Sequence, residues 1–438
     1  MPRASEFVGR YRWLICLLLF FGTSINYIDR QILSLLKPIL DDQLHWTNEE
    51  YGSVNAAFQG AYAIGLLLFG PFVDRVGTKL GYAVSITAWS LAALGHGFVG
   101  SVGGFFRARV ALGVSEGGNF PSAIKAVALW FPKSERALAT ALFNSGANVG
   151  AVLAPAIVPV VAATWGWQSA FVLAGCAGLA FLVLWLPLYD LPERTARLSA
   201  GELAHIRADR EESAAVEAAS GTASAGRQKW LSLLRYRQTW SFVVCKLLTD
   251  PVWWFFLIWL PDYFKKTRAL DLKASWVYLV SIYSIVTVLS ILGGWLTGYL
   301  VKQGFTPVRA RKLAMFGFAA CVLPILFVTK ASNWGAVLLI GVAGAAHQAW
   351  SANLFTTVSD MFPKRAVGSV VGLGGMAGSL GGIAFPILAG KLLDHFTKRG
   401  DVTAGYAILF AFCGFAYLLA FGISHLLAPK FAPVSDLQ

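Results

Sequence analysis

Charged residues are scarce in this chain. Only 13% of its 438 residues are charged and 56% are apolar, whereas a soluble domain carries about 25% charged residues. The cysteines stand singly in apolar stretches, without the spacing of a zinc site or of a disulfide framework: Cys16, Cys176, Cys245, Cys321 and Cys413. The sequence also lacks the Gly-rich P-loop pattern. These absences argue against a soluble domain, a zinc enzyme and an ATP-driven transporter.

Long apolar runs take the place of the missing charge. Twelve of them are long enough to cross a bilayer as a helix, which takes about 20 mostly apolar residues. Because the runs are continuous rather than alternating, they favour helices over the strands of a β-barrel. We expect membrane spans at 11–37, 51–72, 80–99, 102–124, 136–161, 167–189, 239–263, 274–301, 310–329, 334–358, 366–393 and 403–428. The sequence therefore predicts an all-α membrane protein with twelve transmembrane helices.

The net charge of +13 fits this arrangement. If the N-terminus is inside, most of the 36 Lys and Arg residues fall in loops and tails on the cytoplasmic side, as the positive-inside rule requires. The first span is too long for a signal-peptide core and lacks an A-x-A site, so we expect it to stay in place. Both termini are expected in the cytoplasm, and the lipid bilayer explains the basic excess without a nucleic-acid partner.

The chain divides into two halves of six expected spans each. Residues 190–237 separate them and are polar, with many Ala, Glu and Ser residues, which is typical of a linker. We therefore expect an N-terminal half at 1–189, a cytoplasmic linker at 190–237 and a C-terminal half at 238–438.

The two halves also resemble each other in sequence. WFPKSERALATALFNSGANVGAVLAPAI in the first half aligns with MFPKRAVGSVVGLGGMAGSLGGIAFPIL in the second. The same offset places Gly150 on Gly381 and Glu116 on His347, and such small residues let membrane helices approach closely. Parallel repeats of this kind are typical of transporters whose site lies between the halves near the membrane midplane.

A few ionisable residues interrupt the apolar runs. A charge at the bilayer centre costs about 2.5–3.5 kcal/mol on insertion scales, so such residues usually face a cavity or a partner. Asp29, Arg30 and Glu116 lie deepest in their runs and are the strongest candidates for function. The full set is Asp29, Arg30, Arg109, Glu116, Lys125, Lys246, Asp250 and His347.

Several of these residues also have simpler structural explanations. Lys246 and Asp250 are four residues apart and can pair on one helix face, so they are either an intrahelical ion pair or part of a site. Pro251 follows them and predicts a break or kink, which is a common way to build a transport site. His347 can be a hydrogen-bonded core histidine, and Lys37 is expected to extend its ammonium to the membrane surface.

One loop resembles a known family. GPFVDRVGTKLG, residues 70–81, resembles the loop between helices 2 and 3 of the major facilitator superfamily, whose pattern is G-x-x-x-D-R-x-G-R/K-R/K. Gly70, Asp74, Arg75, Gly77 and Lys79 match this pattern, and Thr78 replaces a basic residue. In that family the loop braces helices on the cytoplasmic side and affects gating, so the resemblance implies a gating role for the matching residues.

Within the superfamily, the chain resembles the anion:cation symporter family. The most specific segments are NYIDR (26–30), RVALGVSEGGNFP (109–121), WFPKSER (130–136), LTDPVWWFFLIWLP (248–261) and AHQAWSANLFTTVSDMFP (346–363). The last two are most similar to bacterial hexuronate (glucuronate and galacturonate) transporters. The resemblance implies the major facilitator fold and a place in the bacterial inner membrane.

The resemblance also implies roles in the first half. Asp29 and Glu116 match the acids that carry protons in that family. Arg30 and Arg109 match basic groups that act on those acids and on the substrate carboxylate, and Tyr62 matches a tyrosine that contacts substrate.

The second half departs from one branch of the family. Lys246 stands where galactonate carriers have a glutamine and Gly375 where they have an asparagine, and both differences argue against galactonate. We expect Lys246 and His347 to contact the substrate. Gln348, Trp350 and Asn353 are expected to supply hydroxyl and ring contacts, since aromatic faces stack on sugar rings.

The expected function is proton-coupled import of a sugar-acid anion, a hexuronate, by alternating access. Such a transporter needs no prosthetic cofactor, uses protons as the coupling ion and is expected to work as a monomer. The alternatives are another organic anion such as an aldonate or a dicarboxylate, coupling to sodium, or a nutrient sensor that binds without transport. A membrane enzyme would need a nucleophile, metal or cofactor constellation, which the sequence does not offer.

Overall fold

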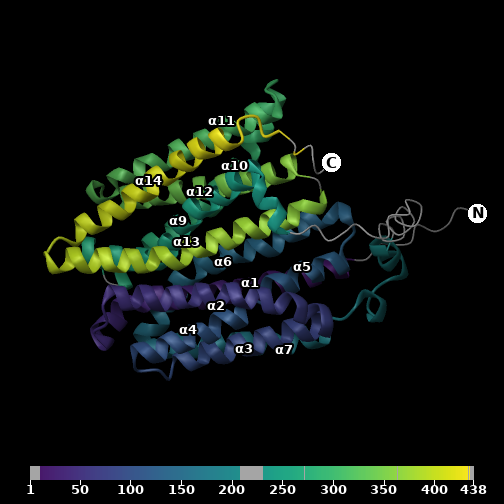
Figure 1. Ribbon diagram of the computed structural model, residues 1–438. Coiled ribbons are helices and arrows are strands. Elements are labelled where there is room, and N and C mark those ends of the chain that lie inside the picture. The colour runs from purple at the N-terminus through teal and green to yellow at the C-terminus, as the bar shows by residue number, and fades with distance from the viewer. Residues whose placement is uncertain (1–9, 208–229, 271, 363, 433, 435–438) are drawn as a thin grey trace, which may run out of the picture. The chain divides into compact units, whose positions relative to one another are not determined.

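The computed structural model describes residues 10–207, 230–270, 272–362, 364–432 and 434 (Figure 1), and every regular element within them is helical. The first half holds α1 (Tyr11–Leu44), α2 (Asn48–Val76), α3 (Thr78–His96), α4 (Val102–Glu116), α5 (Asn119–Trp130), α6 (Lys133–Trp165) and α7 (Trp167–Leu188). The second half holds α9 (Arg237–Arg268), α10 (Leu272–Lys302), α11 (Pro307–Val322), α12 (Asn333–Met361), α13 (Lys364–Lys398) and α14 (Val402–Leu427). Short 3-10 helices occupy Pro192–Arg194 (η1), Trp230–Arg235 (η2) and Leu323–Lys330 (η3).

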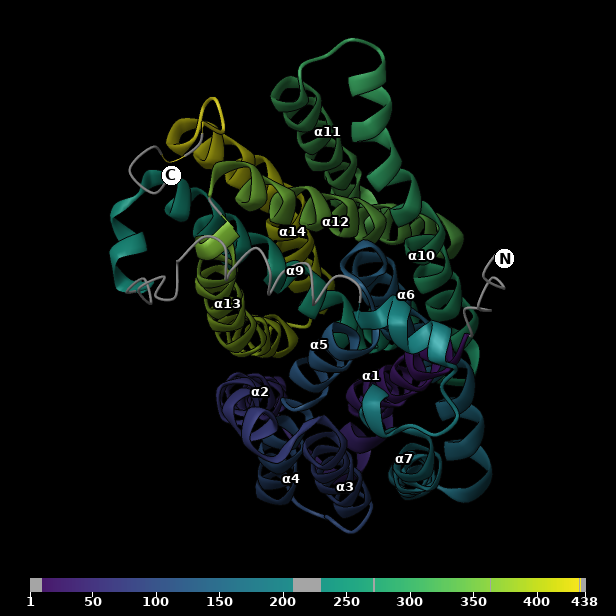
Figure 2. The same ribbon diagram turned by 90° about the vertical axis from the view of Figure 1, so that its right-hand side faces the viewer.

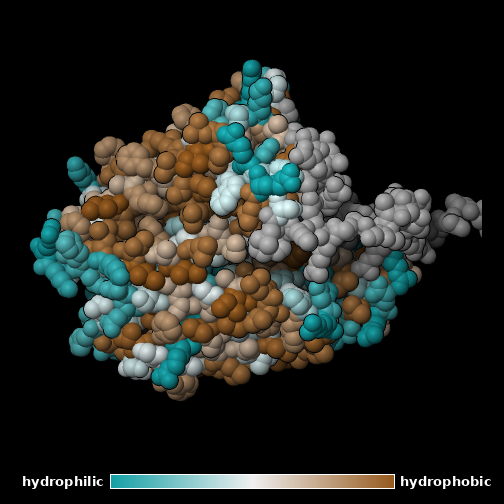
Figure 3. Space-filling model, viewed as in Figure 1, coloured by the Kyte–Doolittle hydropathy of each residue, from teal (hydrophilic) through white to brown (hydrophobic). Residues whose placement is uncertain are grey.

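The helices have the length and composition of membrane spans. Among the described residues, 10 helices are long and apolar enough to cross a bilayer, and the expected spans at 80–99 and 102–124 are helical as α3 and as α4 with α5. Large apolar side chains remain exposed, such as Leu67, Phe98 and Leu426 at 76%, 82% and 72%. Figure 3 shows apolar side chains over much of the visible surface. Such exposure fits contact with lipid rather than water.

Contacts within the chain define two compact units. The first unit is Met1–Ile32, Ala61–Ala154 and Val161–Arg227, and the second unit is Leu33–Gly60, Pro155–Val160 and Gln228–Gln438. In the first unit α3 packs against α4, α5 and α7. In the second unit α9 packs against α13 and α14, while α10, α11 and α12 pack against one another (Figure 2).

The expected fourth span is not one continuous helix. α4 ends at Glu116 and α5 begins at Asn119. At this break the backbone of α2 passes so close that a Cβ on Gly117 would collide with Gly65, and a Cβ on Gly65 would collide with the carbonyl of Val114. Glycine at both positions therefore allows the two backbones to touch, and the break places Glu116 at the end of α4.

Of the break or kink predicted at Pro251, the break is wrong. α9 continues from Arg237 to Arg268 through Pro251 and Pro261. Proline is tolerated in membrane helices because neighbouring groups satisfy the freed backbone atoms. Here the ring of Pro251 packs against α13 at Gly381, where a Cβ would lie 2.6 Å from Pro251 Cγ. The missing side chain at Gly381 leaves room for the ring.

The duplicated glycines pack in the same way in both halves. A Cβ on Gly150 of α6 would lie 2.5 Å from the carbonyl oxygen of Ser24 on α1. A Cβ on Gly381 of α13 would lie 2.8 Å from the carbonyl oxygen of Leu247 on α9. Each glycine therefore admits the backbone of the first helix of its own half, which supports the packing role expected from the repeat.

The segment after α7 caps α1. Glu202 lies in a helical stretch, 200–207, and its carboxylate accepts hydrogen bonds from the backbone N–H groups of Tyr11 and Arg12 at 3.1 and 3.0 Å. Arg12 in turn donates to Glu135 of α6 from two nitrogens, at 2.8 and 3.1 Å. The amide donors that begin a helix have no partner within it, so Glu202 stabilises the start of α1. The rest of the expected linker, 208–229, lies outside the described residues.

Candidate functional site

An ion pair between α1 and the end of α4 lies at the centre of the first unit's polar cluster. Arg30 Nε donates to Glu116 Oε2 at 2.7 Å, and the side chains are 7% and 0% exposed. The guanidinium carbon of Arg30 also lies 4.9 Å from the ring centre of Tyr27 and 4.4 Å from that of Tyr62. Cation–π contacts of this kind hold a buried arginine in one orientation. Tyr62 therefore contacts Arg30.

Asp29 is buried beside this pair. The residue is 2% exposed, and neither of its carboxylate oxygens has a hydrogen-bond partner within the described residues. The charges of Glu116, Arg109 and Arg30 all act on it, and Arg109 is itself buried. The structure thus brings together the candidate site residues of the first half: the acids Asp29 and Glu116 and the arginines Arg30 and Arg109. A buried carboxylate without hydrogen bonds is costly as an anion.

The second unit holds a separate ion pair on α9. Lys246 Nζ lies 2.7 Å from Asp250 Oδ2, as their spacing predicted, and 4.8 Å from the ring centre of Phe355 on α12. A Cβ on Gly378 of α13 would collide with the Asp250 carboxylate. The glycine therefore leaves space for this buried pair.

His347 belongs to an aromatic cluster in the second unit. Its Nδ1 lies 2.6 Å from the hydroxyl of Tyr417, and its ring stacks on Trp253 with centroids 5.6 Å apart. Trp350 meets Tyr417 edge-on at 5.7 Å. The Trp350 Nε1 is buried and has no hydrogen-bond partner among the described residues. His347 is thus hydrogen-bonded within the fold, whereas Trp350 retains an unused donor.

The remaining candidates on α12 lie differently. Gln348 is half-buried. Asn353 donates to the carbonyl of Ala349 at 2.9 Å and accepts from the hydroxyl of Thr297 on α10 at 2.7 Å. Asn353 therefore contacts α10, whereas His347 and Trp350 share Tyr417 of α14.

The loop between α2 and α3 joins neighbouring helices of the first unit. Gly77 has φ of 87°, which favours glycine. Asp74 Oδ1 accepts from Lys125 Nζ of α5 at 2.7 Å. Lys79 donates to Asp190 Oδ2 at 2.9 Å, and this bond holds the pKa of the Asp190 carboxyl below its usual range. Two ion pairs thus connect this region to α5 and to the end of α7, while Arg75 is exposed.

A buried ion cluster in the second unit escaped the sequence analysis. Lys37 was expected to reach the membrane surface, and this is wrong, because its side chain is 1% exposed and pairs with Asp41 and Asp262 at 2.7 and 2.8 Å. Lys37 Nζ also donates to Asn48 Oδ1 at 3.1 Å, and the Tyr406 hydroxyl donates to Asp262 at 2.5 Å. The one local signal is the four-residue spacing of Lys37 and Asp41.

Comparison with known proteins identifies the family. Residues 19–386 match the profile of the Major Facilitator Superfamily. The hexuronate transporter of Escherichia coli (strain K12) is 30% identical over 404 residues, 91% of this chain and 90% of that protein. The galacturonate transporter of Dickeya chrysanthemi is 31% identical over 287 residues, 65% of this chain and 81% of that protein.

A solved structure supports the same fold. The structure of a bacterial homologue of the human lysosomal transporter Spinster matches with a TM-score of 0.75 and 16% identity, covering 97% of this chain and 98% of that chain. This likeness concerns the fold alone. Together with the family match, it shows that the chain belongs to the Major Facilitator Superfamily and is an integral membrane transporter, not an enzyme, related to hexuronate and galacturonate transporters.

Proposed function

We propose that this protein is a proton-coupled symporter that imports a sugar-acid anion, a hexuronate, by alternating access. Proposed with it are twelve membrane spans, a boundary between halves at 190–237, cytoplasmic termini and a place in the bacterial inner membrane. The transporter works as a monomer, without a prosthetic cofactor, and protons are its coupling ion. The relatives named for hexuronate and galacturonate transport support the substrate class.

The Arg30–Glu116 pair is the observation that carries this proposal. The Glu116 carboxylate accepts a hydrogen bond from Arg30 Nε at 2.7 Å and neutralises the guanidinium, in the way that a substrate carboxylate would. Protonation of Glu116 removes that charge and leaves the guanidinium of Arg30 able to bind an incoming carboxylate. Loss of the proton restores the pair and displaces the substrate. Proton and anion therefore bind together and leave together.

Asp29 is proposed as a second proton-binding group. It is buried beside Arg30 and Arg109, whose charges act on it, and its oxygens have no hydrogen bond to satisfy them within the described residues. Its charge is therefore sensitive to whether Glu116 is ionised. Arg109 is proposed to interact with both acids, Asp29 and Glu116, and with the substrate carboxylate.

Contacts to the sugar are assigned to the remaining candidates. Trp350 is the strongest of them, because its buried Nε1 can donate to a hydroxyl without giving up another bond. Lys246 is neutralised by Asp250, so a substrate carboxylate at Lys246 would compete with that aspartate. The other proposed contacts are Tyr62, His347, Gln348 and Asn353. The gating loop of Gly70, Asp74, Arg75 and Gly77 is proposed to act through the Asp74–Lys125 ion pair.

Transport in liposomes tests the coupling. The wild type should concentrate glucuronate or galacturonate when the outside is made acidic. The variant Glu116→Gln should still exchange substrate in counterflow but should lose uphill uptake, because glutamine cannot release a proton. The control Lys398→Gln changes an exposed lysine at the end of α13 and should behave like the wild type.

The same assay decides between the alternatives. Uphill uptake by Glu116→Gln would contradict the proton role of Glu116. Uphill uptake that follows a sodium gradient at constant pH would show that sodium, not the proton, is the coupling ion. A panel of aldonates and dicarboxylates is offered in counterflow as well. If one of them exchanges faster than the hexuronates, that anion replaces the hexuronate as the proposed substrate. Binding without any counterflow would indicate a sensor.

A further inference from the structure

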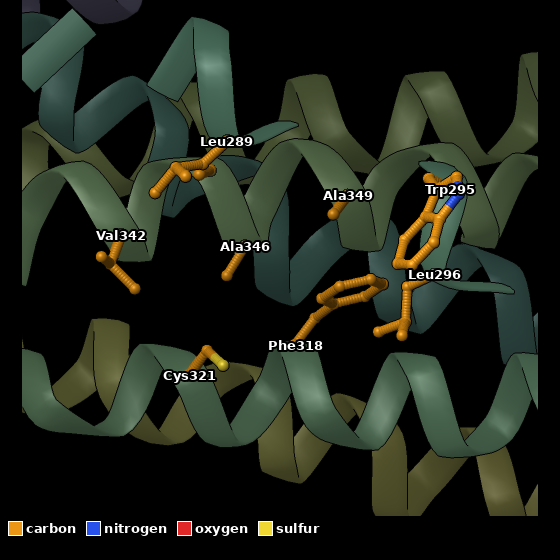
Figure 4. Close-up of a pocket in the computed structure, with 9 residues that line it drawn as sticks. Leu289, Trp295, Leu296, Phe318, Cys321, Val342, Ala346 and Ala349 are labelled. Carbon is orange, nitrogen blue, oxygen red and sulfur yellow. The ribbon is translucent and has the colours of Figure 1, made fainter. Parts of the chain in front are cut away.

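An apolar cavity opens between α10, α11 and α12 of the second unit (Figure 4). Its volume is about 270 Å³, and its walls include Leu289 and Trp295 of α10, Phe318 and Cys321 of α11, and Ala346 of α12. The stick view shows these side chains surrounding a common space between the three helices. The lining carries almost no polar group, so the cavity suits a hydrocarbon chain rather than a sugar acid.

A polar cavity follows the apolar one along the same helices. Its volume is about 470 Å³, and Thr297, Lys302, Arg311, Asn353 and Thr356 line it. Thr297 comes directly after Leu296 of the apolar lining on α10, and Asn353 comes one helical turn after Ala349 of that lining on α12. The two cavities therefore follow one another along α10 and α12, and we refer to them together as the groove, with an apolar section and a basic section.

The basic section has unused hydrogen-bonding capacity. The Arg311 side chain is 12% exposed, and one of its amino groups pairs with Asp360. Its Nε is buried and has no hydrogen-bond partner within the described part of the chain. Lys302 is the last residue of α10 and is exposed. A ligand with several anionic oxygens, such as a phosphate group, would satisfy the Nε and face both cations.

The groove also has the polarity gradient of a membrane leaflet. Trp295 and Tyr299 of α10 stack with centroids 4.8 Å apart and are 61% and 40% exposed. Exposed Trp and Tyr gather where hydrocarbon meets the headgroups. They lie where the apolar section gives way to the basic section, close to the end of α10 at Lys302. The apolar section therefore corresponds to the hydrocarbon and the basic section to the headgroups.

We propose that this groove, lined by α10, α11 and α12, binds an anionic glycerophospholipid. One acyl chain occupies the apolar cavity, and the phosphate binds Arg311 and Lys302. The apolar section distinguishes this ligand from free phosphate, which would leave it empty. The two cations distinguish it from a lipid without net charge.

Native mass spectrometry of the purified full chain tests the proposal, with phosphatidylglycerol and phosphatidylcholine as probes of equal chain length. The wild type should retain phosphatidylglycerol preferentially. Arg311→Gln should lower this preference about fivefold, the effect of one basic charge near an anionic lipid surface. Lys330→Gln removes an exposed cation at the end of η3 and should leave the preference unchanged. Ala346→Leu fills the apolar cavity and should weaken binding of both lipids.

Cysteine labelling provides a second readout that needs no substitution of Arg311. Cys321 lines the apolar cavity, and Cys176 is an exposed cysteine of the first unit. Phosphatidylglycerol should slow the reaction of Cys321 with a maleimide more than phosphatidylcholine does, and Cys176 should react equally with both. The proposal is overturned if the wild type retains the two lipids equally, if Cys321 reacts equally in both, or if millimolar inorganic phosphate displaces the lipid completely.

Discussion

Lys37 Nζ on α1 lies 2.8 Å from Asp262 Oδ1 on α9, and both side chains are almost completely buried. Lys266 Nζ lies 3.2 Å from the same aspartate oxygen. The outer shell of this cluster includes Asp394, whose carboxylate accepts from the backbone N–H groups of Asn48 and Glu49 at 2.9 and 2.8 Å. Charged side chains therefore attach α1 and the start of α2 to α9 and α13 within the second unit.

Removing one partner of this pair should destabilise the protein strongly. Asp262→Asn leaves Lys37 with one anion fewer in a buried position, and breaking a buried pair costs about 3–5 kcal/mol. We expect a large drop in the thermal midpoint measured in detergent. Removing both charges, as in Lys37→Met with Asp262→Leu, should cost less than Asp262→Asn alone. Lys398→Gln, an exposed lysine at the end of α13, is the control. A double variant that is less stable than the single one would contradict this account.

The crossing of α2 and α4 should tolerate no side chain. Gly117→Ala places a methyl group against the backbone of Gly65, and such overpacking costs about 1–3 kcal/mol. Gly103→Ala adds the same methyl group to α4 where no described atom lies within 4 Å, so it should be neutral. The thermal midpoint of Gly117→Ala should therefore be lower than that of Gly103→Ala. Equal midpoints would show that the contact between α2 and α4 is not tight.

Tyr27 should support Arg30 through its ring rather than its hydroxyl. Its ring centre lies 4.9 Å from the guanidinium carbon, and a cation–π contact is worth about 0.5–2 kcal/mol. Tyr27→Leu should therefore weaken substrate binding about 2- to 30-fold, while Tyr27→Phe should change it little. Isothermal titration or counterflow affinity measures both. Equal losses in the two variants would assign the effect to the hydroxyl instead.

The Arg12–Glu135 pair should make stability depend on pH in the acid range. The hydrogen bond from Arg12 lowers the pKa of the Glu135 carboxyl in the folded protein. The pair therefore contributes its stability above the unfolded pKa of about 4.3 and loses it as pH falls through the lower folded value. Glu135→Gln should be less stable than the wild type at pH 6, and the difference should shrink toward pH 3. Lys398→Gln should follow the wild type throughout.

Features that depend on neighbours in sequence were predictable. Apolar length located the helices, and the four-residue spacing of Lys246 and Asp250 allowed an ion pair on one helix face, which the structure shows at 2.7 Å. The repeat predicted equivalent packing at Gly150 and Gly381, and both glycines do admit the backbone of a neighbouring helix. In each case the determining information lies within one helix or one repeated segment.

Features that depend on distant partners were not predictable. Lys37 is buried because Asp262 neutralises it from 225 residues away, and a single sequence carries no signal for such a pair. The helix break was predicted at Pro251, because proline removes a backbone donor. An unpredicted break lies in the expected fourth span at Gly117, where the backbone of α2 comes close, while α13 makes room for the proline ring of α9 at Gly381.

The repeat preserves packing at one pair of matched positions but not the chemistry at another. Gly150 and Gly381 do the same steric work in the two halves, whereas Glu116 and His347, related by the same offset, have unlike partners: an arginine for one and a tyrosine for the other. The repeat thus keeps the same steric role at its matched glycines, while the ionisable groups at its other matched position have different partners. Exchanging small residues between matched positions of the two halves should accordingly leave transport unchanged. Exchanging Glu116 and His347 should abolish transport.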